Sequence, residues 1–127
     1  MKLNGLTPSL LVDNIRTTVD FYHSNFGFEV LTTMPTGEAY EWAMVKRNDV
    51  VLMFQAKAAL KGKMANVTGG KTGAGISLHI AMEGVEDLFN EVYEEVEFVC
   101  ELDESPSGGM EFTILDPNGY LVTFSGN

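Results

Sequence analysis

The sequence predicts an α+β fold in which two tandem βαβββ modules form a cupped, incompletely closed mixed sheet with helices on the outside. The first observation is an internal repeat, because the apolar pattern of residues 7–55 recurs over residues 77–125 at a constant offset of 70. The second is that each copy holds one stretch of helical spacing among stretches of strand-like alternation. The third is the length, since 127 residues are the usual size of one domain. We therefore expect residues 1–127 to form a single domain.

The repeat also sets the boundaries of the two modules. It aligns apolar residues with apolar residues, as in Leu10 with Ile80, Ile15 with Val85, Phe28 with Phe98, and Phe54 with Phe124. Module one therefore covers about residues 5–55, module two covers about residues 77–125, and the stretch 56–76 is a linker loop. The linker is rich in Ala and Gly and indicates a basic lid or interface arm, with lysines at Lys57, Lys61, Lys63 and Lys71.

The elements of each module follow from residue spacing. An alternating strand over residues 7–12 precedes a helix that contains Ile15, Val19, Tyr22 and Phe26, and either Asp13 or Asn14 is placed to cap it. Three strands then follow, at about 28–33, 39–46 and 50–55. Module two repeats this order with a strand at 77–82, a helix from Val85, and strands at about 97–102, 109–115 and 120–125.

The turn Asp116-Pro117-Asn118-Gly119 sets the register of the last hairpin. Pro at its second position and Gly at its fourth favour a three-residue loop with a bulge, which pairs Asp116 with Tyr120. The core face of module two then holds Phe112, Ile114, Val122 and Phe124. The same parity in module one predicts a core face of Tyr40, Trp42, Met44, Leu52 and Phe54. It leaves a second face of Glu41, Ala43, Val45, Val51, Met53 and Gln55.

Composition and charge exclude several classes of partner. Eighteen acids against eight Lys and Arg give a formal charge of −10, which excludes general binding to nucleic-acid phosphates. Residues 76–127 contain no Lys or Arg. We expect no membrane partner, since no apolar run approaches a membrane span and the N-terminus lacks a signal-peptide pattern. Cys100 is the single cysteine, reads as a buried small residue within a strand, and gives no sign of an oxidising compartment. These features predict a cytoplasmic protein.

The same segments resemble a known superfamily. Leu11-Val12-Asp13-Asn14-Ile15, Phe21-Tyr22, Phe26-Gly27-Phe28 and the ending from Glu111 to Gly119 resemble the vicinal oxygen chelate superfamily. This group includes glyoxalase I, extradiol dioxygenases, fosfomycin-resistance enzymes and bleomycin-resistance proteins. The resemblance implies a cupped sheet around a ligand cavity that is often completed across a homodimer. We expect a homodimer here also because an incomplete cup leaves sheet edges that a second copy can cover.

The resemblance also identifies where a catalytic metal would bind. Metalloenzymes of the superfamily place His, Glu or Gln ligands at four cavity-facing positions, which are Thr7, Met53, Ser77 and Thr123 in this sequence. None of these is a usual ligand of a catalytic divalent metal. We therefore expect no metal, no cofactor and no catalytic residues, and the sequence is most similar to the metal-free, bleomycin-resistance-like branch. Whether any reaction is catalysed stays open at this point.

Several polar side chains are candidates for contact with a ligand. His79 shares a strand face with Ser77 and can serve as a ligand contact, a general base, a displaced metal ligand or a hydrogen-bonded structural group. Glu41 and Glu111 are related by the repeat and form either a symmetric cradle for an ammonium or guanidinium group or bridges to backbone groups. The full set of predicted ligand-binding residues is His79, Glu41, Glu111, Met53, Gln55, Ser9, Ser77, Thr113 and Thr123. Trp42 is expected in the core rather than in the site.

Three functions remain compatible with the sequence. The first is a small-molecule-binding protein that sequesters a cationic or amphipathic ligand without a catalytic metal, as antibiotic-sequestering relatives do. The second is a lyase, isomerase or dioxygenase of the same superfamily with a shifted metal site, built from His79, Glu41 and Glu111. The third is an accessory module whose main role is association with other proteins. We favour the first, because the metal-ligand positions lack ligands and the second module is acidic.

Overall fold

A computed structural model describes residues 1–34, 40–60, 62, 71–73 and 75–127. Module one contains β1 (Ser9–Val12), α1 (Ile15–Phe26), β2 (Glu29–Met34), β3 (Trp42–Arg47) and β4 (Val50–Ala56). Module two contains β5 (Ser77–Met82), α3 (Val85–Val92), β6 (Glu97–Glu104), β7 (Met110–Leu115) and β8 (Leu121–Gly126). A short 3₁₀ helix, Lys57–Ala59, opens the linker, whose residues 61, 63–70 and 74 lie outside the described residues, Lys61 and Lys63 among them.

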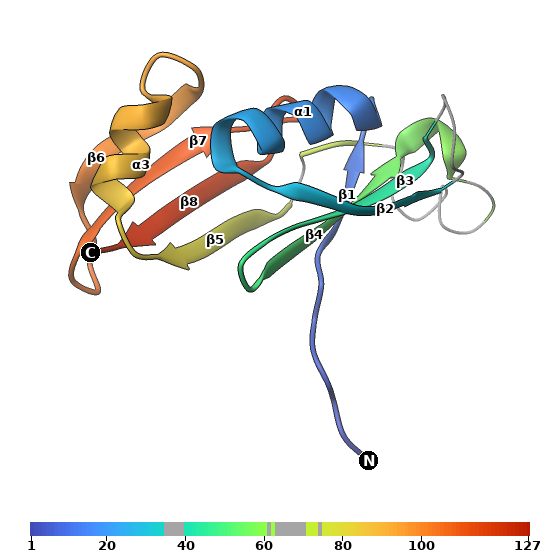
Figure 1. Ribbon diagram of the computed structural model, residues 1–127, viewed down its shortest axis with the longest axis horizontal. Helices are drawn as coiled ribbons and strands as arrows, with labels where there is room; N and C mark the ends of the chain where they lie inside the picture. The colour runs from blue at the N-terminus through green and yellow to red at the C-terminus, as the bar shows by residue number, and fades with distance from the viewer. Residues whose placement is uncertain (35–39, 61, 63–70, 74) are drawn as a thin grey trace.

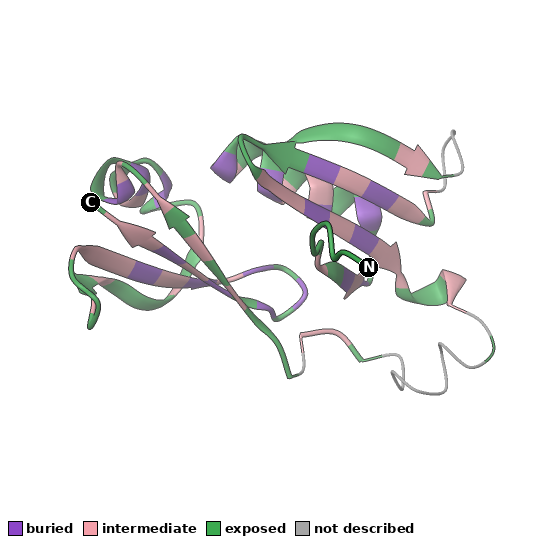
Figure 2. Ribbon diagram, turned by 90° about the horizontal axis from the view of Figure 1, so that it is seen from below, coloured by how far each residue is buried: buried purple, intermediate pink, exposed green. Residues whose placement is uncertain are grey.

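The two modules have the same topology, which confirms the predicted α+β fold. The strand orders are β1-β4-β3-β2 and β5-β8-β7-β6, so each module forms a four-stranded mixed sheet of its own. In each sheet the first strand pairs in parallel with the last, and the other pairs are antiparallel. Figure 1 shows both helices on the same side of the two sheets, and Figure 2 shows their other faces from below, side by side and without a helix over them. We call these uncovered surfaces the open faces.

Local sequence explains where α1 begins and ends. The Asn14 side chain accepts a hydrogen bond from the backbone N–H of Thr17 at 2.9 Å, so Asn14 rather than Asp13 is the N-cap. The helix ends at Gly27, which adopts a left-handed φ of +69° that favours glycine. The residue that aligns with Asn14 in module two is Gly84, which precedes α3 without a side-chain cap. No helix among the described residues is long and apolar enough to cross a membrane.

The predicted hairpin of module two is confirmed. Phe112 pairs with Phe124, Thr113 pairs with Thr123, and the backbone N–H of Asp116 donates to the carbonyl of Tyr120 at 2.9 Å. The four predicted core residues of this hairpin are all buried, as the alternation of apolar and polar positions requires: Phe112, Ile114, Val122 and Phe124. The turn chemistry and the sorting of apolar residues onto one face together predicted the faces of β7 and β8 correctly.

The predicted faces of β3 in module one are wrong by one residue. Ala43 and Val45 are buried and pair with Phe54 and Leu52, whereas Trp42 and Met44 lie on the open face. The cause is the preceding turn, because Arg47 pairs directly with Val50 across a two-residue loop. Its first residue, Asn48, adopts a positive φ of +51°, which suits such a tight hairpin. The β3–β4 loop is thus one residue shorter than the β7–β8 loop. The alignment without gaps therefore places each residue of β3 one position away from its true equivalent in β7.

Cys100 is exposed, contrary to the prediction that it is buried. A register shift between Phe98 and Cys100 interrupts the alternation of β6, so Cys100 pairs with Thr113, a residue of the open face. The aligned residue of module one, Val30, borders a similar shift in β2 and is also exposed. A bulge adds one residue to the strand, so the residues after it face the opposite side from the one that simple alternation predicts. Counting along β6 from the end of the preceding helix therefore assigns those residues to the wrong face.

A buried polar cluster joins the two modules. The hydroxyl of Tyr22 in α1 donates to Asp116 Oδ2 at 2.8 Å, while Asp116 Oδ1 accepts the backbone N–H groups of Asn118 and Tyr120. Desolvation by burial, followed by the charge of Asp116, raises the pKa of Tyr22 far above its ordinary value. Phe26 of α1 also stacks on Phe124 of β8, with ring centroids 4.6 Å apart. The two modules therefore share one core beneath α1.

Candidate ligand-binding site

The open face of module two carries a compact polar group. His79, Thr123 and Thr113 lie side by side on β5, β8 and β7, in one row across the sheet. Thr113 Oγ1 and Thr123 Oγ1 are 2.7 Å apart, so one hydroxyl donates to the other. His79 Nε2 lies 2.6 Å from Ser125 Oγ, one pleat along the neighbouring strand. The threonines are half-buried and His79 is exposed, so this row can meet a ligand from the open side.

Glu111 and Ser77 lie on the same open face, in the rows on either side of His79. Glu111 sits on β7 directly opposite Ser125, with Asp103 of the edge strand as its other neighbour. Ser77 lies at the start of β5, opposite Leu121. The structure therefore brings five of the nine predicted residues onto one surface, which are His79, Glu111, Ser77, Thr113 and Thr123.

The open face of module one is more apolar. Ser9 of β1 pairs with Met53 of β4, and Met53 pairs with Met44 of β3. In the next row, Gln55 pairs with Trp42, whose indole is half-buried. Thioether and indole side chains present adaptable apolar surface to a ligand. The side-chain amide nitrogen of Gln55 donates hydrogen bonds to the carbonyls of Glu41 and Ala56, at 3.1 and 3.2 Å.

Glu41 does not occupy the position equivalent to Glu111. Ser125 and Gln55 are equivalent residues of the last strands, and Glu111 faces Ser125 whereas Trp42 faces Gln55. Glu41 precedes β3 and is exposed, and its carbonyl accepts the backbone N–H of Ala56 at 2.8 Å. The expectation of a symmetric pair of glutamates is therefore wrong, for the same one-residue difference in turn length. Whether Glu41 touches a ligand stays a prediction.

Trp42, Met44 and Ser125 are open-face residues that were missing from the predicted site. Ser125 follows from the confirmed parity of β8, and its contact with His79 depends on a diagonal approach between strands. Trp42 and Met44 were hidden by the assumption that both hairpin loops have the same length. The Asn48-Asp49 pair at the turn is the signal for the shorter loop, because Asn readily adopts the positive φ that a two-residue hairpin needs.

The side chains at the four metal-ligand positions do not fit a catalytic divalent metal. Thr7 precedes β1 and Met53, Ser77 and Thr123 lie on the open faces, so the four supply only hydroxyl and thioether groups. Catalytic zinc and related ions are held mainly by imidazole, carboxylate and thiolate groups. Within the described part of the chain, no three His, Cys, Asp or Glu side chains are grouped to hold a metal ion.

The comparison of sequences decides the family. The glyoxalase/bleomycin resistance protein/dioxygenase superfamily matches residues 3–124, nearly the whole chain. The chain belongs to this superfamily. Its two βαβββ modules and uncovered sheet faces agree with that membership. No curated protein matches the chain significantly.

Solved structures of similar fold include proteins named for binding antibiotics. UcmS2 is 19% identical, with a TM-score of 0.79 over the full length of both chains. TnmS3, an antibiotic binding protein from Streptomyces sp. CB03234, is 19% identical with a TM-score of 0.75 over 98% of this chain and 97% of its own. The bleomycin-binding protein from bleomycin-producing Streptomyces verticillus, complexed with copper(II)-bleomycin, is 24% identical with a TM-score of 0.67 over 100% and 98%. These similarities support the superfamily fold.

Proposed function

We propose that this superfamily member is a small-molecule-binding protein that holds a cationic or amphipathic ligand on its open faces without a catalytic metal. The observation that carries the proposal is the contrast between the two faces. Trp42, Met44 and Met53 give module one an apolar surface, whereas His79, Glu111 and the two threonines give module two a polar one. A ligand with an apolar part and a polar part matches the two surfaces together.

The charge distribution favours a cation at the polar end. Residues 76–127 carry twelve acids and no Lys or Arg, so the potential around module two is negative. Glu111 is the half-buried acid among the open-face residues, next to Ser125. A carboxylate that is partly shielded from water is the natural partner of an ammonium or guanidinium group. Structural neighbours that are named for binding bleomycin or an antibiotic are consistent with this class of ligand.

A second copy of the chain is expected to complete the binding surface. The edge strand β2 exposes Val30, Leu31 and Met34, at 47%, 53% and 62% of their accessible surface. An apolar edge strand of this kind is protected when another chain covers it. A homodimer would cover such edges and would enclose ligand more fully than one open sheet does.

The positions of the candidate ligands do not favour the alternative with a shifted metal site. It requires His79, Glu41 and Glu111 to meet around one ion, and the described residues contain no such group. His79 and Glu111 lie in different rows of β5 and β7, and Glu41 lies outside the open face of module one. An association module without ligand binding is tested by the same experiment as the proposal.

Trp42 provides the test, because the single tryptophan of the chain lies on the open face of module one. We expect saturable quenching of its fluorescence by members of a panel of cationic antibiotics, bleomycin among them, with weaker binding at high salt. Glu111→Gln should weaken binding about tenfold, as expected for loss of a charge-assisted hydrogen bond. Glu94→Gln removes the same charge from an exposed position after α3 and should leave binding unchanged. If no cationic ligand alters the fluorescence or the melting temperature, the proposal fails.

A further inference from the structure

The internal symmetry of the fold is broken at one of its two equivalent junctions. The loop between β7 and β8 docks onto the β1–α1 junction through specific hydrogen bonds. Asn118 Oδ1 accepts the backbone N–H of Asp13 at 3.0 Å, and Asn118 Nδ2 donates to Thr18 Oγ1 at 2.9 Å. The Tyr120 hydroxyl donates to the carbonyl of Leu11 at 2.7 Å. These hydrogen bonds tie the loop to the junction.

Among the described residues, the equivalent junction on the other side has none of these hydrogen bonds. The loop between β3 and β4 is one residue shorter, and Val50 stands where module two has Tyr120. Leu88 of α3 stands where α1 has Thr18, and Ala81 aligns with Leu11. In the part of the chain that the structure describes, no hydrogen bond joins this loop to β5 or α3. The missing tyrosine ring and the shorter loop leave space between the modules.

That space is an open pocket of about 690 Å³, which we call the junction pocket. Its apolar wall comes from α1, the α1–β2 connection, β5, α3 and β8, through Phe26, Phe28, Ile80, Met82, Leu88 and Phe124. Its volume lies within the range of about 300–1,000 Å³ that is usual for small-molecule sites. His79, Thr123 and Thr113 do not line this pocket, so its lining differs from the polar row on the open face of module two.

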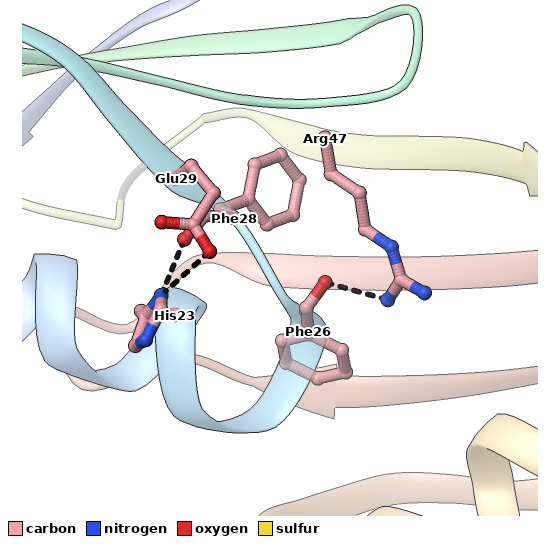
Figure 3. A network of polar contacts seen from close by, with 5 residues as sticks. All are labelled: His23, Phe26, Phe28, Glu29 and Arg47. Carbon is pink, nitrogen blue, oxygen red and sulfur yellow. Dashed lines mark hydrogen bonds and ion pairs between the residues drawn. The ribbon is translucent and has the colours of Figure 1, made fainter.

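Arg47 gives the junction pocket one positioned cation. Its guanidinium donates from Nη1 to the carbonyl of Phe26 at 2.7 Å, which fixes it at the end of α1, as Figure 3 shows. Within the described residues Arg47 forms no ion pair. A guanidinium has five N–H donors in a planar fork, so most of its donors remain available to an acceptor in the pocket. Two exposed carboxylates, Asp49 and Glu83, also border the pocket and disfavour a second negative charge.

We propose that the junction pocket binds an apolar small molecule that carries a single carboxylate. The apolar body packs against the phenylalanines and Leu88, and the carboxylate accepts hydrogen bonds from Arg47. Binding is favourable because it removes apolar surface from water and gives the positioned guanidinium an anionic partner. This site is distinct from the one proposed for the open faces, and it selects a ligand of the opposite charge.

The test is an NMR titration of the ¹⁵N-labelled protein with three probes of one shape. The probes are 2-naphthylacetate, its uncharged amide, and 2-(2-naphthyl)ethylamine. We expect saturable chemical-shift changes at the backbone amides of Phe28, Val50 and Leu88. The acetate should bind most tightly, the amide less tightly and the amine most weakly. Arg47→Gln should weaken acetate binding about tenfold and leave the amide unchanged, whereas Arg47→Lys should retain part of the preference. Lys46→Gln is the control, because Lys46 lies on the opposite face of β3.

A second variant tests the pocket without touching its charge. Val50→Tyr places in module one the side chain that Tyr120 supplies in module two, so it should fill the pocket and abolish binding of all three probes. The proposal is overturned if none of the probes shifts these amides or if the amine binds most tightly. It is also overturned if Val50→Tyr binds as well as the original chain. Chemical-shift changes that depend on the protein concentration and not on the probe concentration would show that a second copy of the chain occupies the pocket. That result would also overturn the proposal.

Discussion

Tyr22→Phe tests the buried polar cluster that joins the two modules. Tyr22 is fully buried, and its hydroxyl is the donor to Asp116 Oδ2 at 2.8 Å. Removal of the hydroxyl leaves that oxygen without its donor, while the other carboxylate oxygen keeps two backbone N–H groups. A hydrogen bond to a charged group contributes about 1.5–3 kcal/mol, so we expect the free energy of unfolding to fall by about 2 kcal/mol. For a domain of this size that corresponds to a melting temperature lower by about 8 °C.

The same variant makes a prediction about pH. Because burial and Asp116 raise the pKa of Tyr22, the folded state keeps its proton where the unfolded tyrosine loses it, near pH 10. This stabilisation is therefore fully present below pH 10 and declines as the pH rises further. At pH 11 the original chain should lose about 1.4 kcal/mol through this group alone, and Tyr22→Phe should not. The stability difference between the two proteins should shrink from about 2 to about 0.6 kcal/mol.

Urea unfolding at pH 7 and at pH 11 measures both effects. Tyr93→Phe is the matched control, because Tyr93 is half exposed and should show neither the loss at pH 7 nor the narrowing at pH 11. A Tyr22→Phe protein as stable as the original at pH 7 would refute the role of the hydroxyl. A stability difference that stays constant between the two pH values would refute the role of burial in holding the tyrosine protonated.

Three further predictions concern the hairpin of module two and the single cysteine. Asn118→Ala removes two hydrogen bonds, to Asp13 and to Thr18, and at about 1 kcal/mol for each bond should cost about 2 kcal/mol in urea unfolding. Gly73→Ala should lower the melting temperature more than Gly119→Ala. Both glycines have positive φ, but an added Cβ at Gly73 would lie 2.7 Å from the backbone of Gly119. Native Cys100 should react with a thiol reagent as fast as the unfolded chain, whereas protection would contradict its exposure.

Sequence periodicity was sufficient for the fold because each element of this protein carries its own local signal. The apolar spacing of α1 and α3, the Asn14 cap and the Pro-Asn-Gly turn each agree with the structure that forms. The repeat then predicts the topology of module two from that of module one. Even the face of each residue in β7 and β8 followed from the type of turn between them together with their alternation of apolar and polar residues.

The site was predicted only in part, because faces depend on loop length and bulges. Because the loop between β3 and β4 is one residue shorter than predicted, Trp42 and Met44 lie on the open face. Ala43 and Val45 lie in the core instead. A bulge in β6 moved Cys100 to the open face in the same way. Both are single-residue events in otherwise regular strands, and the period-2 pattern gives no warning of them. The junction pocket was equally hidden, because it arises from the difference between two copies and not from a motif in either.

Ligand binding in the presence of excess chelator tests the central claim most directly. Cationic antibiotics are titrated into the protein while Trp42 fluorescence is followed, with and without EDTA, and the ligand is recovered for mass spectrometry. The account predicts saturable binding with the same affinity in both conditions and recovery of the ligand unaltered, since Thr7, Met53, Ser77 and Thr123 do not suit a catalytic metal. Binding that is lost in EDTA, or a ligand that returns chemically changed, would contradict it.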